Sequence, residues 1–328
     1  MYQPTPVNKG LCGEDSTGAG LMNFCVIITH DYGDYADALA ASLQQALGGF
    51  RLYTLVIGGP VPKFRSRNIV PLEIEDVQHP TIDALKRKYL SVGRSDEFRW
   101  SMKSVFLSHL LDQGIEKVVF VDPDICFLAD PAFLFDQLDR ARVLLTPHWR
   151  CPNPTHDESN FRILQTDGLF NAGFVGVSQG AQAALKWWGE ACLYRCDVCP
   201  SEGFFVDQAY LDMMPIYFED VEIVRHRGCN VANWNLSENT RELIDGRVLI
   251  RGHDPVIFIH FTASTIRGIL DGRDAHLRPH LDQWFRWRGV GESEYDRYLT
   301  VTADSGETDS LFWRGVRKAR RYVSGAVL

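Results

Sequence analysis

The stretch Val118-Val119-Phe120-Val121-Asp122-Pro123-Asp124 decides the fold prediction. Its four consecutive apolar residues predict a short strand that is buried on both faces, which is typical of the parallel sheet of an α/β protein. Such sheets bind their ligands beyond the carboxyl ends of the strands. Two carboxylates stand at that end, and Pro123 stiffens the turn between them. The stretch therefore predicts a ligand site at Asp122 and Asp124.

The residues on either side of this stretch alternate between strand and helix patterns. Continuous apolar runs predict strands, and apolar residues at helical spacing followed by glycine predict helices. We expect a mostly parallel α/β sheet with helices on both faces. The strands are expected at 24–29, 52–57, 118–121, 143–146, 173–177 and 256–261, and the helices at 34–47, 98–113, 181–194 and, as a short helix, near Asp207.

Composition excludes several classes of protein. The chain has 328 residues, of which 45% are hydrophobic and 23% charged, which is typical of a folded protein. The net charge of -8 opposes a nucleic-acid partner. No apolar run is long enough for a transmembrane helix, and eight cysteines are too dilute for a disulfide scaffold, so we expect a cytoplasmic protein with reduced thiols. Cys192, Cys196 and Cys199 match zinc-site spacing only weakly.

The sequence suggests three parts. Residues 1–21 are rich in glycine and proline and predict a flexible leader, 22–290 predict one α/β domain, and 291–328 predict an extension. Within the extension, 311–323 carry five basic residues among aromatic and aliphatic ones. This pattern is typical of an amphipathic helix that rests on an anionic membrane surface, so a peripheral contact with the inner face of the membrane is one expectation. The alternative is a docked or disordered tail.

Asp122 and Asp124 are candidate metal ligands. Carboxylates separated by one residue can share a divalent cation, and hard oxygen ligands suit Mg²⁺ or Mn²⁺. His260 ends the late apolar run 257–261 and offers a nitrogen ligand for the same ion. The alternatives are an ordinary acidic turn for the two aspartates and a hydrogen-bonded core residue for the histidine.

Several short motifs follow one another in a fixed order between residue 24 and about 265. By these motifs the chain resembles the GT-A nucleotide-sugar glycosyltransferases, specifically a bacterial group distantly similar to the glycogenin-like and lipopolysaccharide galactosyltransferase enzymes. The motifs are Thr29-His30-Asp31-Tyr32, Lys103, Val119-Phe120-Val121-Asp122-Pro123-Asp124, Phe170-Asn171-Ala172-Gly173-Phe174, Phe205-Val206-Asp207-Gln208, Asn230-Val231-Ala232-Asn233-Trp234-Asn235 and His260-Phe261.

The resemblance implies a role for each matching position. Asp122 would contact the ribose and the metal, Asp124 would chelate the metal, and His260 would complete the protein ligands. The other donor-binding residues implied are Thr29 and Tyr32 at the base, Lys103 at the diphosphate, and Asn171, Ala172 and Gly173 beside the sugar. The segment 230–235 is both polar and aromatic, which is consistent with a sugar pocket of Asn230, Asn233 and Trp234, although Trp234 is equally compatible with core packing.

Sugar transfer defines what the catalytic residues must do. When the bond between the anomeric carbon and the diphosphate breaks, negative charge develops on the leaving group and a divalent cation stabilises it. The anomeric carbon gains oxocarbenium character, which a carboxylate or amide oxygen on its far side stabilises. Asp207 and Gln208 are the candidates for that role. The alternative is that Asp207 caps the following helix and Gln208 is ordinary polar surface.

The resemblance implies a hexosyltransferase that uses Mn²⁺ or Mg²⁺. It would move a sugar, with UDP-hexose favoured as donor, to a saccharide or glycolipid acceptor in polysaccharide biosynthesis, with retention of anomeric configuration. One alternative is a sugar nucleotidyltransferase, although the glycine-rich basic loop that would meet a triphosphate is missing after the first strand. The other is a non-catalytic saccharide-binding protein on the same fold.

Overall fold

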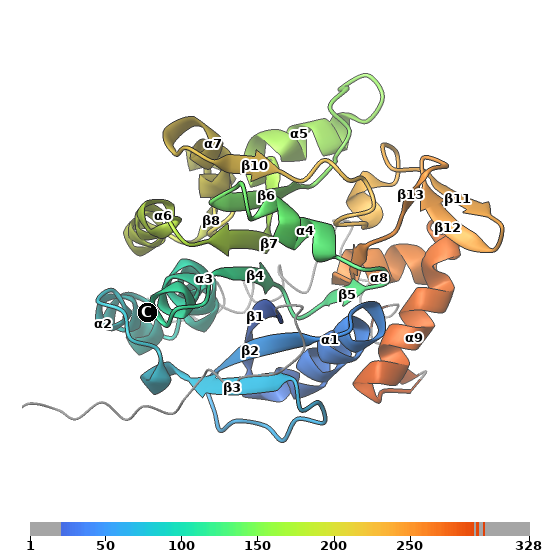
Figure 1. Cartoon of the computed structure of the whole chain (residues 1–328). Helices are drawn as coiled ribbons and strands as arrows, with labels where there is room; N and C mark the ends of the chain where they lie inside the picture. The colour runs from blue at the N-terminus through green and yellow to red at the C-terminus, as the bar shows by residue number, and fades with distance from the viewer. Residues whose placement is uncertain (1–20, 292, 295–297, 299–328) are drawn as a thin grey trace, which may run out of the picture.

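A seven-stranded sheet forms the centre of the protein (Figure 1). The computed structural model describes residues 21–291, 293, 294 and 298. The strands of this sheet are β1 (Met22–Thr29), β2 (Phe50–Ile57), β3 (Ile69–Glu73), β4 (Lys117–Val121), β6 (Val143–Pro147), β7 (Phe170–Ser178) and β10 (Val221–Ile223). Their order is β10-β6-β7-β4-β1-β2-β3. Only β7 is antiparallel to its neighbours, so the predicted mostly parallel sheet is confirmed.

Short strands outside the central sheet complete the β-structure. β5 (Ile125–Phe127) pairs antiparallel with β14 (Phe258–His260), which is shorter than the strand predicted at 256–261. β11 (Arg241–Ile244), β12 (Arg247–Ile250) and β13 (Asp254–Pro255) form a three-stranded antiparallel sheet. β8 (Val198–Cys199) pairs with β9 (Phe204–Phe205). Because β14 belongs to the late apolar run predicted at 256–261, its pairing with β5 places this run beside the turn that carries Asp122 and Asp124.

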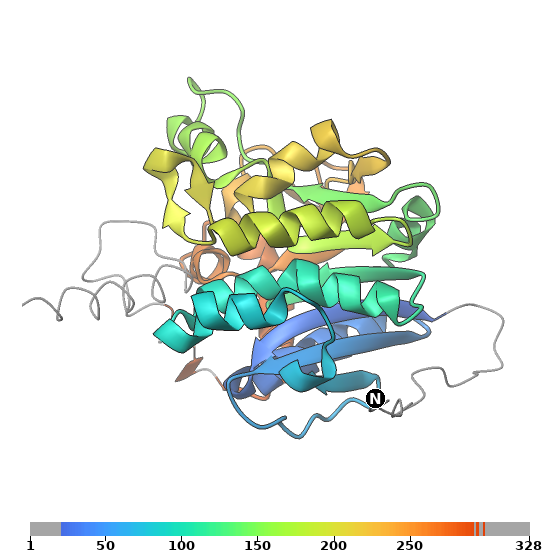
Figure 2. The same ribbon diagram turned by 90° about the vertical axis from the view of Figure 1, so that its left-hand side faces the viewer.

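Helices cover both faces of the central sheet. The α-helices of the described residues are α1 (Gly33–Ala46), α2 (Ile82–Lys88), α3 (Ser95–Asp112), α4 (Ala132–Gln137), α5 (Glu158–Asp167), α6 (Gln182–Tyr194), α7 (Met214–Tyr217), α8 (Ala263–Leu270) and α9 (Arg278–Arg288). The helices α3 and α6 lie side by side over one face (Figure 2), and α1 packs on the other. Successive residues of β1 point to opposite faces of the sheet. Ile27 belongs to the core under α3 and α6, and Val26 belongs to the core under α1.

A third apolar core lies between α1, α8 and α9. Arg288 of α9 pairs with Asp34 of α1, with 2.8 Å between Nε and Oδ2. Tyr298 is buried and its hydroxyl lies 3.3 Å from that of Tyr35, so packing continues past the predicted domain end at residue 290. The predicted leader, apart from residue 21, and the predicted basic helix at 311–323 lie outside the described residues. Among the helices that the structure describes, none has the length and hydropathy needed to span a membrane.

Candidate active site

Asp122, Asp124 and His260 meet at the carboxyl end of β4. The two aspartates follow β4 directly, and the Asp122 N–H donates to the carbonyl of Gly173 on β7 at 2.8 Å. Because β14 runs antiparallel to β5, it returns His260 to the turn that precedes β5, and the Phe261 N–H donates to the Asp124 carbonyl at 2.8 Å. One ligand atom from each of the three residues lies within 4.8 Å of the other two.

The charges of this cluster are strongly coupled. His260 Nε2 lies 2.9 Å from Asp124 Oδ1, and both side chains are largely buried. Burial alone would lower the pKa of His260, but the Asp124 carboxylate raises it by more, and the net shift is upward. Burial raises the pKa of Asp124 and the histidine lowers it by more, so the net shift of the pKa is downward. A hydrogen bond from His260 Nε2 to the Asp124 carboxylate therefore holds the two side chains together.

Gly173 provides the space in which the cluster sits. A Cβ atom at this position would lie 2.7 Å from His260 Cε1 and 2.8 Å from both Asn171 Oδ1 and Asp122 Oδ2. Real Cβ atoms do not make contacts this short, so an alanine here would displace a carboxylate or the imidazole. The glycine is required for close approach at this point.

Two asparagines fix the imidazole from behind. Asn171 Nδ2 lies 3.2 Å from His260 Nδ1 and donates to Asn230 Oδ1 at 3.2 Å. The Asn171 Oδ1 accepts from the Gly173 N–H at 2.6 Å, and Asn230 Nδ2 donates to the Pro147 carbonyl at 3.1 Å. The predicted residues Asn171 and Asn230 thus come together from segments that are far apart in the sequence.

Trp234 belongs to the same cluster, whereas Asn233 has its observed contacts elsewhere. The Trp234 and His260 rings meet edge to face, with centroids 5.5 Å apart. The Trp234 Nε1 donates to the His148 carbonyl at 3.0 Å. Asn233 Oδ1 accepts from the hydroxyls of Ser264 and Thr265 at the start of α8, at 3.1 and 3.2 Å. The donor-binding role of Asn233 stays a prediction.

Lys103 is a buried cation between two carboxylates. Its Nζ lies 3.3 Å from Asp122 Oδ1 and 3.2 Å from Asp207 Oδ2, and it donates to the Ala172 carbonyl at 3.0 Å. Burial lowers the pKa of Lys103, but the two aspartates raise it by more, so the ammonium stays charged. The ion pair with Asp122 means that Lys103 helps to hold this carboxylate in place. Its predicted contact with a diphosphate stays a prediction.

The residues predicted to be catalytic lie beside this cation. Asp207 is 1% exposed and Trp188 Nε1 donates to its carbonyl at 2.8 Å. Gln208 is half-buried; its Oε1 accepts from the Ala172 N–H at 3.3 Å. The alternative that Asp207 caps the next helix is wrong, because the N-cap of the 3-10 helix at 209–213 is Gln208 and no side-chain cap bond is formed. Val206 takes a positive φ of 45°, which is strained for a β-branched residue.

The residues predicted at the base lie at the carboxyl end of β1, where Thr29 is its last residue and Tyr32 follows in a 3-10 helix. The Thr29 hydroxyl donates to Asp31 Oδ1 at 2.5 Å, and the Tyr32 ring stacks on Tyr35 with centroids 4.6 Å apart. Burial raises the pKa of Tyr32, and the charges of Arg99 and Asp124 act on it in opposite directions. Tyr32 therefore lies within electrostatic reach of the metal-ligand candidates.

Sequence reasoning missed Arg99, whose charge acts on both Tyr32 and Lys103. It stands four residues before Lys103 on α3, and residues at that spacing share one face of a helix. Its ion pair with Asp96, at 3.1 Å, leaves it partly exposed. The spacing of four residues between Arg99 and Lys103 is the feature of the sequence that could have indicated Arg99.

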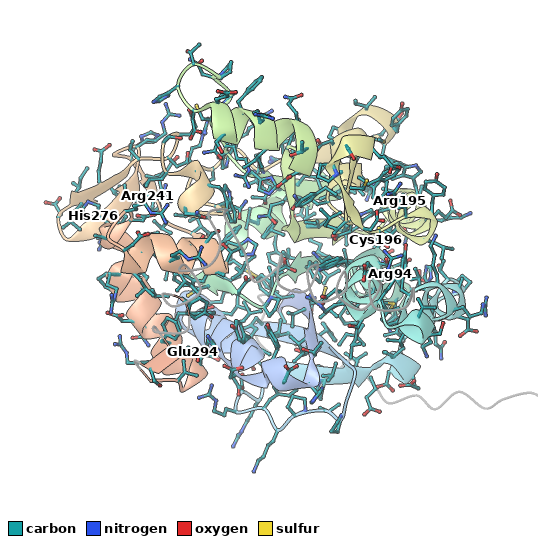
Figure 3. The ribbon with its side chains drawn as sticks, turned by 180° about the vertical axis from the view of Figure 1, so that it is seen from behind. Arg94, Arg195, Cys196, Arg241, His276 and Glu294 are labelled. Atoms are coloured by element: carbon teal, nitrogen blue, oxygen red, sulfur yellow. The ribbon has the colours of Figure 1, made fainter. Side chains whose placement is uncertain are left out.

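The three clustered cysteines do not form a metal centre in the described part of the chain. Cys192 and Cys196 are buried, while Cys199 donates to Glu202 at 3.2 Å. Figure 3 shows Cys196 close to Arg94 and Arg195, whose guanidinium groups both face Asp197. No group of three ligand atoms includes these thiols among the described residues.

Comparisons with known proteins agree with this architecture. No family model matches the chain. The uncharacterized proteins YfnF and YfnD of Bacillus subtilis (strain 168) are each 28% identical to it, over 79% and 69% of this chain and 87% and 72% of their own lengths. The galactosyltransferase LgtC, solved with donor and acceptor sugar analogs, superposes with a TM-score of 0.51 at 15% identity, over 84% of this chain and all of LgtC. Mouse xyloside xylosyltransferase 1 gives 0.47 at 14% identity, over 74% of this chain and 98% of its own.

The class of fold follows from the sheet and the LgtC superposition together. The order of the central strands, the antiparallel β7 and the carboxylates after β4 define an α/β fold with its ligand edge at β4. The protein has the GT-A fold of nucleotide-sugar glycosyltransferases, and its architecture is similar to that of LgtC.

Proposed function

We propose that this protein is a metal-dependent glycosyltransferase that moves a sugar from a nucleoside-diphosphate sugar, UDP-hexose, to a saccharide or lipid-linked saccharide. The observation that carries the proposal is the convergence of Asp122, Asp124 and His260 at the end of β4 of a GT-A fold. Retention of anomeric configuration and a role in polysaccharide synthesis are parts of the proposal that rest on the sequence resemblance. The relatedness of the fold to LgtC supports the reaction class.

The chemistry of the cluster fits Mn²⁺ or Mg²⁺. Two carboxylates supply the hard oxygen ligands that these ions prefer, and one imidazole adds a nitrogen ligand. The absence of a Cβ at Gly173 leaves the three side chains free to approach one point. The bound ion would neutralise charge on the leaving diphosphate. Water and donor oxygens would supply the remaining ligands, which is usual for these ions.

The chain's own residues would then orient the donor. Lys103 holds Asp122 against β4, and Asn171 and Asn230 hold the imidazole of His260. Gln208 is anchored to the Ala172 N–H at 3.3 Å, which places its amide beside the small residues predicted to meet the sugar. We infer that Gln208, more exposed than Asp207, is the group that faces the anomeric carbon, while Asp207 balances the charge of Lys103.

Arg99 is the partly exposed cation at this site. It lies on α3 four residues before Lys103, and its charge lowers the pKa values of both Tyr32 and Lys103. We infer that it meets the donor diphosphate, for which an arginine fork is well suited. A cytoplasmic location, with a peripheral membrane contact through 311–323, completes the proposal; those residues lie outside the described part of the chain.

Calorimetric titration of UDP and GDP, with and without Mn²⁺, tests the proposal. We expect the wild type to bind one nucleoside diphosphate only with the metal, and Asp124→Ala to lose that binding. Asp139→Asn, which changes an exposed aspartate that pairs with Lys117, is the matched control and should bind as the wild type does. Proton NMR of the product's anomeric signal tests retention.

Two other outcomes would favour the alternative functions. Release of pyrophosphate from a nucleoside triphosphate and a sugar phosphate would identify a nucleotidyltransferase. Saccharide binding by a folded protein that binds no nucleotide would identify a saccharide-binding protein, and either result would overturn the transferase proposal.

A further inference from the structure

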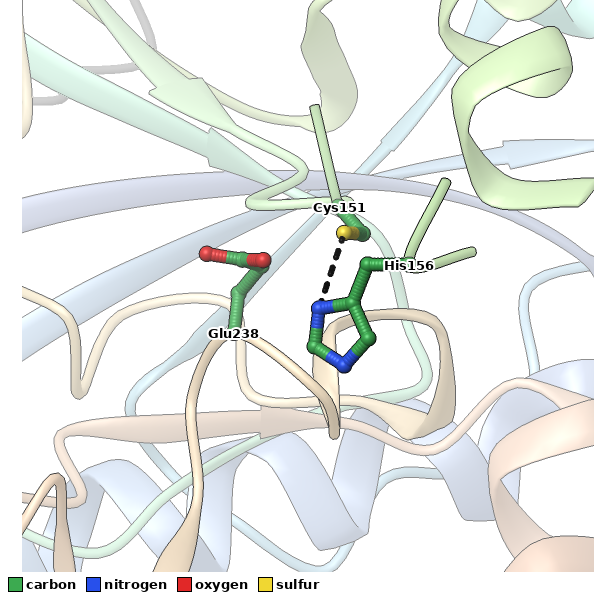
Figure 4. A group of neighbouring side chains, drawn as sticks. All are labelled: Cys151, His156 and Glu238. Atoms are coloured by element: carbon green, nitrogen blue, oxygen red, sulfur yellow. Dashed lines mark hydrogen bonds between the residues drawn. The ribbon is translucent and has the colours of Figure 1, made fainter. Parts of the chain in front are cut away.

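A second group of potential metal ligands lies outside the candidate active site. Cys151 and His156 belong to the loop between β6 and α5, and Glu238 to the loop that precedes β11. One ligand atom from each lies within 4.8 Å of the other two. Figure 4 shows the three side chains pointing toward one another from the two loops. Sequence patterns gave no indication of this cluster, because Glu238 is remote in the chain from the other two residues.

The distances suit a tetrahedral ion. Cys151 Sγ lies 3.8 Å from His156 Nδ1. A tetrahedral zinc ion with a sulfur bond of about 2.3 Å and a nitrogen bond of about 2.0 Å would separate these two atoms by about 3.5 Å. The observed separation is close to that value, so an ion would need only a small shift of either side chain.

A catalytic Cys–His–Glu triad is the main alternative, and the geometry opposes it. In a triad the carboxylate orients the histidine from the side opposite the nucleophile. Here a Glu238 carboxylate oxygen lies within 4.8 Å of Cys151 Sγ as well as of the imidazole nitrogen, so the carboxylate and the imidazole both lie next to the sulfur. The three ligand atoms are therefore arranged around one point, as ligands of a single ion would be, and not in a line from sulfur to imidazole to carboxylate.

We propose that Cys151, His156 and Glu238 bind one Zn²⁺ ion at a site separate from Asp122, Asp124 and His260. The sulfur, nitrogen and oxygen donor set suits zinc and is unsuited to Mg²⁺ or Mn²⁺. Cys151 is buried whereas His156 is exposed, so the site opens to solvent on one side and water completes the tetrahedron. This inference does not depend on the proposed transferase activity.

The ion would fasten the two loops that position Trp234. The carbonyl of His148, three residues before Cys151, accepts from Trp234 Nε1 and from Asn235 Nδ2, both at 3.0 Å. Trp234 in turn contacts the ring of His260. A zinc bridge from Cys151 to Glu238 would join the same two segments a few residues farther out, and would hold this wall of the candidate active site.

Cobalt substitution tests the site directly, because only a thiolate ligand gives a sulfur-to-Co²⁺ charge-transfer band. The full-length protein is stripped of metal under reducing conditions and titrated with Co²⁺. We expect one equivalent to develop the band in the wild type and in Cys199→Ser, a control that removes a thiol outside the cluster. The band should disappear in Cys151→Ser, and zinc should displace it in the wild type.

A second variant keeps the test decisive if Cys151→Ser fails to fold. His156 is exposed, so His156→Gln should fold, and we expect it to weaken Co²⁺ binding at the thiolate site at least tenfold. The control His253→Gln changes another exposed histidine and should have no effect. Absence of the charge-transfer band in the folded wild type would overturn the proposal, as would an undiminished affinity in His156→Gln.

Discussion

The described part of the chain carries two three-residue clusters of metal-ligand type, and they differ in the structural elements that position them. Asp122, Asp124 and His260 stand at the ends of paired strands, and Gly173 leaves room for them. The second cluster, proposed as the zinc site, is carried by loops, with one of its ligands exposed to solvent. Strand pairing positions the first cluster, whereas loop conformation positions the second, and an ion there would join the two loops.

The two clusters also differ in the atoms that they offer to a metal ion. The first cluster has two carboxylates and an imidazole, which suit an exchangeable ion that also binds a substrate phosphate. The second has a thiolate, an imidazole and a carboxylate, which suit Zn²⁺. We propose that the first cluster serves the reaction and that an ion at the second stabilises the two loops, and the following predictions test that division.

The largest effect is expected at the buried cation of the first cluster. Lys103→Met leaves the carboxylates of Asp122 and Asp207 close together without their counter-charge. Breaking a buried ion pair costs about 3–5 kcal/mol, so urea unfolding should show a loss of that size. Lys117→Met removes a partly exposed lysine that pairs with Asp139 and should cost no more than about 1 kcal/mol. Equal losses in both variants would show that Lys103 does not support the cluster.

Asp124→Asn should separate activity from stability. We expect the rate of UDP release from UDP-glucose or UDP-galactose to fall by about 10²–10³, the usual loss when one charge-stabilising group is removed. Thermal stability in the presence of zinc should change little by comparison. Cys151→Ser is the variant to compare with it. We expect Cys151→Ser to lower thermal stability and to have only a small effect on the rate of UDP release. The reverse pattern would contradict the division between the clusters.

Gly173→Ala tests the space within the first cluster. The added methyl group would lie 2.7–2.8 Å from three polar groups, so we expect the affinity for Mn²⁺ in the presence of UDP to fall at least about tenfold. The control Gly48→Ala places its Cβ in open space and should bind as the wild type does. Calorimetry gives both values, and unchanged affinity in Gly173→Ala would mean that the ion binds elsewhere.

Metal removal should destabilise the protein through the second cluster. A loss of about 1 kcal/mol corresponds to a fall of about 2–4 °C in the melting temperature for a chain of this size class. We expect dialysis against a chelator to cause a fall of this order in the wild type and in Asp124→Asn. In Cys151→Ser the chelator should have no effect, and a fall of the same size there would assign the stabilising ion to another site.

The smallest effect concerns His148, which lies between the two clusters. Burial lowers the pKa of this histidine well below its usual value, and the nearby charges of Arg150 and His260 lower it further. Below about pH 6.5 the unfolded chain takes up a proton that the folded chain does not bind, so stability falls with falling pH. His148→Gln should reduce the slope of unfolding free energy against pH in that range. If the curves of unfolding free energy against pH were parallel for the wild type and His148→Gln, His148 would not cause the loss of stability at low pH.

The strands next to the site could be predicted because their signal is local. β4 is apolar at four consecutive positions since both of its faces are covered, and the acidic turn follows at once. The patterns did not indicate β3, β10, α2 or α5, which are short or partly exposed and lack a continuous apolar run. Helical spacing placed Lys103 on α3 but could not show that its ammonium would be enclosed by two aspartates.

The sequence by itself determined the α/β class, the buried strand before Asp122 and the presence of two carboxylates at its end. These features follow from the periodicity of neighbouring residues, which sets burial along a strand or helix. Only the tertiary structure decided that β14 pairs with β5 and so brings His260 to Asp124, that Asn171 meets Asn230, and that Glu238 joins Cys151. Those contacts join distant parts of the chain, and their geometry depends on how whole elements pack together.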